Sequence, residues 1–495
     1  MKKVKLLSII LASALASTML AGCSGTKTAS VKEEDPNEVP SDTYEINWYL
    51  QGTPQDDVAS VEEAVNEYLK DKINATLKIH RLETSQYQKQ VTTMIQAGEY
   101  FDMAFCANWC LDYKPNSRNG AFLALDDYVD KYLPKTVENM GEDILNNARV
   151  DGKIYAIPNM KEISEERGWT YRPDIAKKYN IDMSSIKSLD ELKPYLLKIK
   201  ENEPDMQYPI DWGSDRTPAT LLRYDGDIAQ GVAIFFDRYE GKVMSLTETP
   251  EYLEACKKAN EFYNDGLIKR DIATASDFEQ RVKDGKTFCY IDFLKPGKAK
   301  ETSANYPFEL DQASISPNYQ YNGAGVGSMI AVSRTSKNPA RVLRFIELLN
   351  TDTYLNNLIN FGIEGKHYTK LEDGRIHIEP DTSYTMNGYQ WMTANIFVNY
   401  LTDKEEPDKL EKMREFNKNA EKVCTYGFDF DPSEVEMEIS ALKTVSTQYA
   451  TQVSMGAQDP EPIMKEYTQK LKEAGLEKVI SVAQEQYDKF LAEKN

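Results

Sequence analysis

The order of strand-like and helix-like segments between residues 44 and 106 is the feature that most limits how this chain can fold. Residues 44–50 alternate apolar and polar side chains and are rich in β-forming residues, which is typical of a strand. Residues 58–69 repeat apolar side chains at helical spacing, and residues 75–79 are a second strand candidate. A helical stretch over 86–96 and a third strand at 102–106 follow. This β-α-β-α-β order predicts a mostly parallel sheet flanked by helices.

The same alternation resumes after about residue 160. Capping-box patterns at 188–191 and 276–279 predict helix starts, and Thr249 followed by Pro250 predicts another. Further strand candidates are 208–212, 287–291 and 323–332, with a helix candidate at 339–350. From Tyr389 onward the pattern is almost entirely helical. At 495 residues the chain is long enough for two or three domains.

The N-terminal residues are arranged like a bacterial secretory leader followed by a spacer. Three lysines precede the apolar run 6–20, which is shorter than a membrane-spanning helix requires. The sequence Leu20-Ala21-Gly22-Cys23 resembles the bacterial lipoprotein box, in which the cysteine is acylated and becomes the mature N-terminus. The alternative is an ordinary signal peptide with an incidental cysteine. We expect a signal peptide over 1–22, lipidation of Cys23, a flexible tether over 23–43, and a location on the extracellular face of the cell membrane.

Charge and cysteine content exclude several classes of function. The formal net charge of −20 disfavours nucleic acid and anionic lipid surfaces, because phosphate binding requires clustered lysine and arginine. Besides Cys23 there are five cysteines, an odd number that cannot form a complete disulfide framework. Cys106 and Cys110 are close in sequence, but their spacing alone is weak evidence for a bridge, and no ligand set completes a zinc site. We expect no metal, no cofactor, no nucleic acid partner, and membrane contact through the lipid alone.

Several motifs, taken in order, resemble the sugar-binding group of extracellular solute-binding lipoproteins that serve bacterial ABC importers. The segments that carry the resemblance are Glu99–Asp102, Asn119–Asp126, Asp151–Pro158, Tyr171–Asp174, Lys177–Asp182, Thr249–Tyr252 and Phe262–Leu267. Residues 361–368 are similar to a signature of Gram-positive lipoproteins, and residues 427–490 resemble the helical tail of that subgroup. Each motif is weak alone, but together they cover residues 44–490 in a consistent order.

The resemblance implies an α/β fold of two discontinuous lobes joined by a hinge, the type II periplasmic-binding-protein-like fold. Lobe 1 is expected to take residues 44–158 and 323–366, and lobe 2 residues 159–322 and 367–426. The helical tail, 427–495, is expected to pack on lobe 2. The implied function is to capture a carbohydrate such as an oligosaccharide in the cleft between the lobes and to deliver it to the membrane permease. We expect a monomer whose partners are the sugar and the transmembrane subunits of the importer.

A sugar-binding cleft needs flat aromatic rings against sugar C–H faces and short polar side chains for the hydroxyl groups. The resemblance implies that Trp109 lies in a first-lobe ligand loop, that Trp212 lies in a second-lobe loop, and that Trp391 stacks on a sugar ring. Trp169, near the expected hinge, is a further candidate for ligand contact, whereas Trp48 is expected to pack within its strand. The polar candidates are Gln51, Gln55, Asn108, Arg216 and Asp292.

Two other functions stay open from the sequence. A cleft of this kind also accommodates a non-sugar solute such as a peptide, and spacing cannot dismiss the paired carboxylates of a glycosidase or lyase in so acidic a chain. Other enzyme motifs are missing: His80, His367 and His377 cannot form a His-Glu-x-x-His site, and there is no nucleophile elbow or Walker loop. Residues 429–434 resemble a calcium loop only faintly, because the glycine of the EF-hand turn is missing. We therefore expect a binding protein and not an enzyme.

Overall fold

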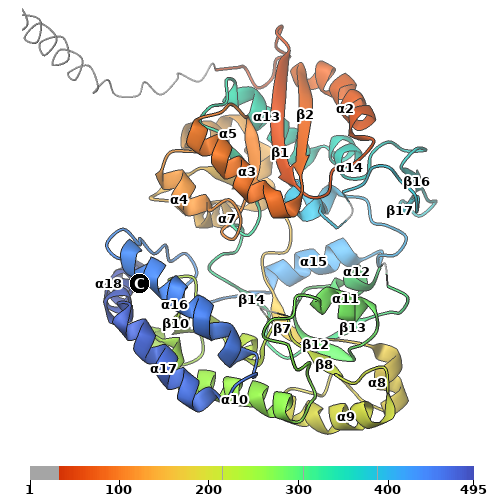
Figure 1. Ribbon diagram of the computed structural model, residues 1–495. Helices are drawn as coiled ribbons and strands as arrows, with labels where there is room; N and C mark the ends of the chain where they lie inside the picture. The colour runs from red at the N-terminus through yellow and green to blue at the C-terminus, as the bar shows by residue number, and fades with distance from the viewer. Residues whose placement is uncertain (1–32, 214–215, 305, 387, 495) are drawn as a thin grey trace, which may run out of the picture.

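The computed structural model describes residues 33–213, 216–304, 306–386 and 388–494, which form two lobes stacked on each other (Figure 1). The expected signal peptide, Cys23 and tether residues up to 32 lie outside the described residues. The chain passes between the lobes near residues 159–165, 315–328 and 396–408. Within the part of the chain that is described, no helix combines the length and the apolar character needed to cross a bilayer.

Lobe 1, the upper lobe of Figure 1, is built on a five-stranded sheet in the order β2-β1-β3-β15-β6. The strands are β1 (Tyr44–Gln51), β2 (Ala75–Leu82), β3 (Met103–Cys106), β6 (Ala156–Pro158) and β15 (Met329–Val332). The sheet is parallel where β1 pairs with β2 and β3, as the sequence predicts, but β15 runs antiparallel to both of its neighbours.

Helices and short strands cover this sheet. The helices are α2 (Val58–Ile73), α3 (Thr84–Ala97), α4 (Tyr113–Arg118), α5 (Asp126–Tyr132), α6 (Pro134–Met140), α7 (Glu142–Asn147), α13 (Pro339–Thr351) and α14 (Thr353–Phe361). The remaining strands are β4 (Arg149–Val150), β5 (Lys153–Ile154), β16 (Tyr368–Lys370) and β17 (Ile376–Ile378). The helical spacing of Val61, Val65 and Leu69 places all three in the core, where Trp48 is also fully buried. Asn74, in the left-handed conformation at φ 45°, ends α2.

Lobe 2 is built on a four-stranded sheet in the order β13-β7-β12-β8. β7 pairs antiparallel with β12 and β13, and β12 pairs in parallel with β8. These strands are β7 (Glu166–Tyr171), β8 (Ile210–Asp211), β12 (Cys289–Leu294) and β13 (Asp311–Ser314). The helices around them are α8 (Pro173–Tyr179), α9 (Leu189–Asn202), α10 (Pro250–Asn264), α11 (Phe278–Lys283), α12 (Lys298–Ser303) and α15 (Lys409–Lys418). The capping box predicted at 188–191 starts α9, where Ser188 Oγ accepts from the Glu191 N–H at 3.2 Å. The box predicted at 276–279 does not form, because α11 begins after Asp277 with no side-chain cap.

Three C-terminal helices extend lobe 2 on the side opposite α8. They are α16 (Glu436–Ser454), α17 (Pro460–Glu473) and α18 (Leu476–Lys494). Their apolar faces share one core with α10 and with a small antiparallel sheet of β9 (Tyr224–Asp225), β10 (Val232–Phe235) and β11 (Val243–Ser245). The short pair β14 (Tyr319–Gln320) and β18 (Glu421–Lys422) lies where the chain enters this region. The helices are therefore fixed to lobe 2 by apolar burial.

The structure corrects the predicted lobe boundary after residue 366. Tyr384, Met386 and Met392 are buried in the core of lobe 1, and the Tyr384 hydroxyl donates to the Ile359 carbonyl at 2.6 Å. The assignment of this stretch to lobe 2 is therefore wrong, because its apolar side chains fill the space beside α14. The chain returns to lobe 2 only near α15, where Lys409 pairs with Glu301.

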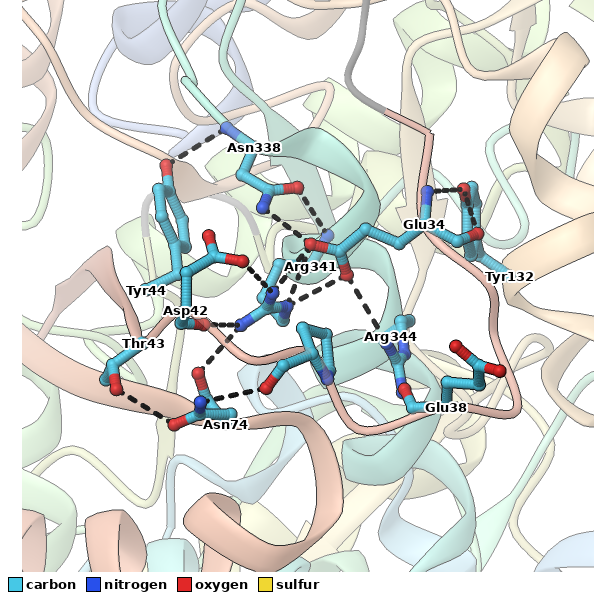
Figure 2. Close-up of polar contacts among 11 residues, drawn as sticks. Glu34, Glu38, Asp42, Thr43, Tyr44, Asn74, Tyr132, Asn338, Arg341 and Arg344 are labelled. Atoms are coloured by element: carbon cyan, nitrogen blue, oxygen red, sulfur yellow. Dashed lines mark hydrogen bonds and ion pairs between the residues drawn. The ribbon is translucent and has the colours of Figure 1, made fainter.

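The structure also corrects the tether, because residues 34–42 are bound to lobe 1 (Figure 2). The Glu34 side chain is 5% exposed, and its carboxylate lies 2.7 Å from the Arg341 guanidinium group and 3.3 Å from that of Arg344. Asn338 donates to the same carboxylate at 2.7 Å. Burial alone would raise the pKa of Glu34, but the hydrogen bonds from Arg341 and Asn338 lower it below its usual range.

The backbone on both sides of Glu34 is held as well. The Tyr132 hydroxyl hydrogen-bonds both the N–H and the carbonyl of Glu34 at 3.0 Å (Figure 2). Arg344 donates to the Glu38 carbonyl at 2.8 Å, and Arg341 donates to the Asp42 carbonyl at 3.2 Å. The expected flexibility is therefore wrong for residues 34–42, because α13 buries two guanidinium groups that need a carboxylate partner.

Candidate functional site

A cavity of about 600 Å³ lies between the lobes and is called the main cavity here. Residues from both lobes and from the connecting segments line it, among them Asn108, Asn159, Arg167, Asp292, Tyr321 and Trp391. Its volume falls within the usual range for small-molecule sites, and its place between two open α/β sheets is where such folds bind ligands.

Two tryptophans form the aromatic part of the lobe 1 wall. The rings of Trp109 and Trp391 have centroids 6.0 Å apart, and both rings contact Phe105 at the end of β3. Trp391 lines the main cavity, and Trp109 is 54% exposed beside it. Each indole N–H is already used, since Trp109 donates to Gly327 at 2.8 Å and Trp391 to Gly388 at 3.0 Å. These bonds fix the rings and leave their flat faces for contact with a ligand.

The opposite wall, from lobe 2, carries polar groups that lack partners. One Arg167 nitrogen pairs with Glu165 at 2.8 Å, but the buried Nε and Nη1 have no hydrogen-bond acceptor among the described residues. The guanidinium group is held between the rings of Phe293 and Tyr321, 3.9 Å and 5.2 Å from their centroids. The Tyr321 hydroxyl and Ser164 Oγ are likewise buried and unpartnered within the described chain. Buried polar groups normally have partners, so these groups indicate a place for ligand oxygen atoms.

Arg216 and Asp292 lie together at the same wall. Arg216 Nε lies 3.1 Å from Asp292 Oδ1, and the Thr170 hydroxyl donates to Asp292 Oδ2 at 2.9 Å. Asp292 is 2% exposed, so the carboxylate is oriented from both sides. It lies within β12, not after the strand as the sequence indicated. Both predicted residues therefore line the main cavity as one ion pair.

Paired charges form another part of this wall. Lys295 lies 3.3 Å from both Glu162 and Glu301, and Lys161 lies 3.1 Å from Glu162. Burial alone would raise the pKa of Glu162, but Lys161 and Lys295 hold it well below its usual range. Burial would lower the pKa of Lys295, but the two glutamates raise it above its usual range. Glu162 and Lys295 therefore both stay charged, and the two charges neutralise each other.

Asp225 and Asp227 lie near the Asn108 end of the cavity. Desolvation between the lobes, followed by the Asp225 charge, raises the pKa of Asp227 to about 6. The Asp227 side chain still contacts solvent, so this desolvation is partial. Among the described residues, no cluster of histidine, cysteine and carboxylate side chains has the makeup of a metal site. Asp429, from the faint calcium motif, instead pairs with Lys114 of lobe 1.

The structure separates the predicted site residues into two groups. Asn108, Trp391, Arg216 and Asp292 line the main cavity, with Trp109 against Trp391. Gln51, Gln55, Trp169 and Trp212 do not line it. Gln51 is 4% exposed at the end of β1, and the Gln55 side chain accepts from the Thr385 N–H at 2.9 Å.

Trp169 and Trp212 are corrections with a clear physical reason. They are 0% and 1% exposed, and both belong to the core between the lobe 2 sheet and its helices. The Trp169 N–H donates to the Ile186 carbonyl at 3.0 Å, and Trp212 packs against Phe262. Each ring faces the helix layer, away from the cleft. The prediction that Trp169 and Trp212 contact the ligand is therefore wrong.

Three further residues line the main cavity but were not predicted from the sequence: Arg167, Tyr321 and Asn159. Arg167 lies in β7 beside Gly168, a position where a Cβ atom would lie 2.2 Å from the Ala313 carbonyl. An arginine next to the buried run Gly168–Thr170 of a short strand is the one signal that points to it. Tyr321 and Asn159 lie in connecting segments with no local pattern. Asn159 is fixed by a 2.8 Å hydrogen bond to Ser328 Oγ.

Two α/β lobes around a cavity with aromatic and hydrogen-bonding walls define the class of two-lobed solute-binding proteins. The chain belongs to the bacterial extracellular solute-binding protein family, whose sequence model matches residues 51–355. Residues 424–492 match a domain of unknown function, DUF3502. Family membership and fold confirm the resemblance drawn from the sequence motifs.

Known relatives extend the similarity over nearly the whole chain. A carbohydrate ABC transporter substrate-binding protein of Streptococcus pneumoniae serotype 4 (strain ATCC BAA-334 / TIGR4) is 28% identical over 484 residues, which are 96% of each chain. The polygalacturonan/rhamnogalacturonan-binding protein YtcQ of Bacillus subtilis (strain 168) is 25% identical over 413 residues, 75% of each chain. The crystal structure of the N-glycan transport solute binding protein (NgtS) of S. pneumoniae has a TM-score of 0.82 at 26% identity, covering 91% of this chain and 100% of that one.

Proposed function

We propose that this protein captures a neutral oligosaccharide in the main cavity and delivers it to the permease of an ABC importer. The observation that carries the proposal is that a fixed tryptophan face and unpartnered N–H and O–H donors line one cavity. Trp391 supplies the aromatic face, while Arg167 and Tyr321 supply the donors. Sugars present both C–H faces and hydroxyl oxygens, so this combination matches them on two walls.

The charges of the cavity favour a neutral ligand over an acidic one. Arg167 pairs with Glu165, Arg216 with Asp292, and Lys295 with Glu162 and Glu301. A sugar carboxylate would have to compete with these carboxylates for cations they already neutralise, and among the described lining cations only Lys298 lies outside such a pair. Relatives are named for ligands of both kinds, N-glycans and polygalacturonan. The paired charges therefore support the N-glycan type of ligand for this chain.

The remaining parts of the proposal concern location and turnover. We infer that Cys23 carries the lipid that holds the protein at the extracellular face of the membrane, and that it acts as a monomer. Its named relatives are transport proteins, so we infer binding without chemical conversion of the sugar.

Titration calorimetry with a panel of ligands tests this proposal. The two glycans bound by NgtS in its crystal complexes, Man1GlcNAc and Man5GlcNAc, are the neutral members. An oligogalacturonide is the acidic member, and a short peptide is the non-sugar member. We expect a heat of binding and a higher melting temperature with at least one glycan. Mass spectrometry should then show that this glycan is chemically unchanged. Binding of the oligogalacturonide or the peptide alone, or cleavage of the glycan, would overturn it.

A further inference from the structure

The C-terminal region of unknown function reaches across the cleft to lobe 1. Helices α16 and α18 lie below α4 and α7 of lobe 1 in Figure 1. The segment before α16, residues 427–432, makes the contact: the Asp429 carboxylate pairs with Lys114, and it lies 3.6 Å from Arg118. Asn322, between the lobes, donates to the Phe428 carbonyl at 2.7 Å. This segment is therefore attached to both sides of the cleft.

A second cavity of about 450 Å³ is lined by residues of this segment, 427–432, and adjoins the main cavity. Asn108, Asp225, Asp227, Asn322 and Gly323 line both cavities. The outer wall of the second cavity comes from α4, α7 and Arg149 of lobe 1, and from residues 427–432 and Ile439 of the C-terminal region. The two cavities are therefore neighbours separated only by these shared residues, where Gly323 carries no side chain and packs against Asn108 and Asp227.

The lining of the second cavity has the same chemistry as a sugar site. Phe428, Phe430 and Ile439 give it an apolar side, and the Phe430 ring is only half-buried. Its cations have partners, because Arg118 lies 3.2 Å from Asp151 and Lys114 pairs with Asp429. Apolar surface beside paired cations, and beside the Asp225 and Asp227 carboxylates that can accept from hydroxyl groups, fits the C–H faces and hydroxyls of a neutral sugar.

We propose that the C-terminal region forms a second sugar compartment, which holds the far end of a glycan whose first units occupy the main cavity. This inference rests on the proposed function. It assigns the region of unknown function a role in ligand length: a short glycan uses the main cavity alone, and a longer or branched one extends to Phe430.

The test compares Man1GlcNAc with Man5GlcNAc by titration calorimetry on the full chain. In the Phe430→Ala variant we expect the affinity for Man5GlcNAc to fall about tenfold, since an interface aromatic is lost, while that for Man1GlcNAc stays unchanged. A second variant, Asn146→Trp, fills the cavity from an exposed position at the end of α7 and is expected to give the same pattern without removing a core contact. The matched control is Phe490→Ala, an aromatic in the same C-terminal core that does not line the cavity.

The outcomes separate the two proposals. If both glycans bind and their affinities are unchanged in Phe430→Ala and Asn146→Trp, the second compartment is wrong and the proposed function stands. An equal loss for both glycans also rejects the compartment, because the residues would then act on the cleft as a whole. If neither glycan binds the wild-type protein, the proposed function fails, and this inference fails with it. Apo melting temperatures identify any variant that has lost its fold.

Discussion

The two faces of the main cavity differ in charge. The described lining residues of lobe 1 are uncharged, with Asn108, Gly327, Gly388 and Trp391 as examples. The described charged lining residues all come from lobe 2 or from the segment that leads into it, as Lys161, Arg167 and Asp292 do. Both faces border one space, so a ligand meets a flat apolar wall on one side and an ionic, hydrogen-bonding wall on the other.

This difference teaches how affinity and selectivity are divided. A tryptophan face acts through contact area, which changes little with pH or salt. A wall of buried ion pairs acts through hydrogen bonds of fixed direction, and each broken pair exposes an uncompensated charge. We therefore expect lobe 1 to set how tightly a sugar ring is held, and lobe 2 to set which hydroxyls are accepted. Substitutions on the two sides should therefore change binding affinity and stability in different ways.

The largest expected effect is on the stability of lobe 1. Glu34→Ala leaves the buried Arg341 and Arg344 without their carboxylate, and we expect a loss of about 3–5 kcal/mol in the free energy of unfolding. Denaturant titration measures it. Glu33→Ala is the matched control, since its pair with Lys131 is on the surface and should contribute little. Equal stability of the two variants would mean that residues 34–42 are a free tether after all.

Next comes a tryptophan behind the lobe 2 face. Trp212→Ala removes a fully buried ring from the core of lobe 2, and we expect a loss of about 3–5 kcal/mol in stability. The affinity of the folded fraction should hold, because the ring does not border the cavity. Thermal unfolding of the apo protein and calorimetry at low temperature measure the two quantities. A normal melting temperature together with lost binding would return Trp212 to the site.

The lobe 1 face itself should show the opposite pattern. Trp391→Ala removes the ring that borders the cavity, and we expect a loss of about 2 kcal/mol in binding, roughly 30-fold in affinity. The apo melting temperature should change little, and the loss should be the same at low and high salt. A fall in melting temperature as large as that of Trp212→Ala would place Trp391 in the core instead.

These two tryptophans also mark the limit of what the sequence predicts. Local periodicity suffices to predict the strands and helices around β1 to β3, because the pattern of side chains within one element determines its type of secondary structure. Trp212 and Trp391 both lie close to the ends of elements. Trp212 is buried because it packs against Phe262 of α10, a contact between segments about fifty residues apart in the sequence. The partners of Glu34 likewise lie in α13, and no local pattern connects positions about three hundred residues apart. Contacts between distant segments fixed these features.

A smaller effect is expected from the donors of the lobe 2 face. Arg167→Met keeps an unbranched side chain of similar length but removes the guanidinium group that stacks on Phe293, together with the N–H groups that have no acceptor among the described residues. We expect binding to weaken by about 1.5 kcal/mol, or roughly tenfold. Arg172→Met is the matched control, since Arg172 stacks on Phe308 and pairs with Asp174 without lining the cavity. If both variants bind like the wild type, Arg167 does not contact the ligand.

The smallest expected effect is a dependence of stability on pH, which a substitution on the charged face should change and one on the uncharged face should not. Asp227 has a pKa of about 6 in the folded chain, above the ordinary aspartate value of 3.8, because of partial desolvation and the Asp225 charge. The folded state therefore holds this proton more tightly, so its stabilising contribution is present below about pH 4 and is lost as pH rises through 6. Asp227→Asn should consequently be more stable than the wild type at pH 7, and the difference should shrink toward pH 5. We expect less than about 1 kcal/mol, because water still screens the side chain. Denaturant titrations at both pH values measure it, with Trp391→Phe on the uncharged face as the control that shows no such trend; a difference that grows toward pH 5 would reverse the sign assigned to Asp227.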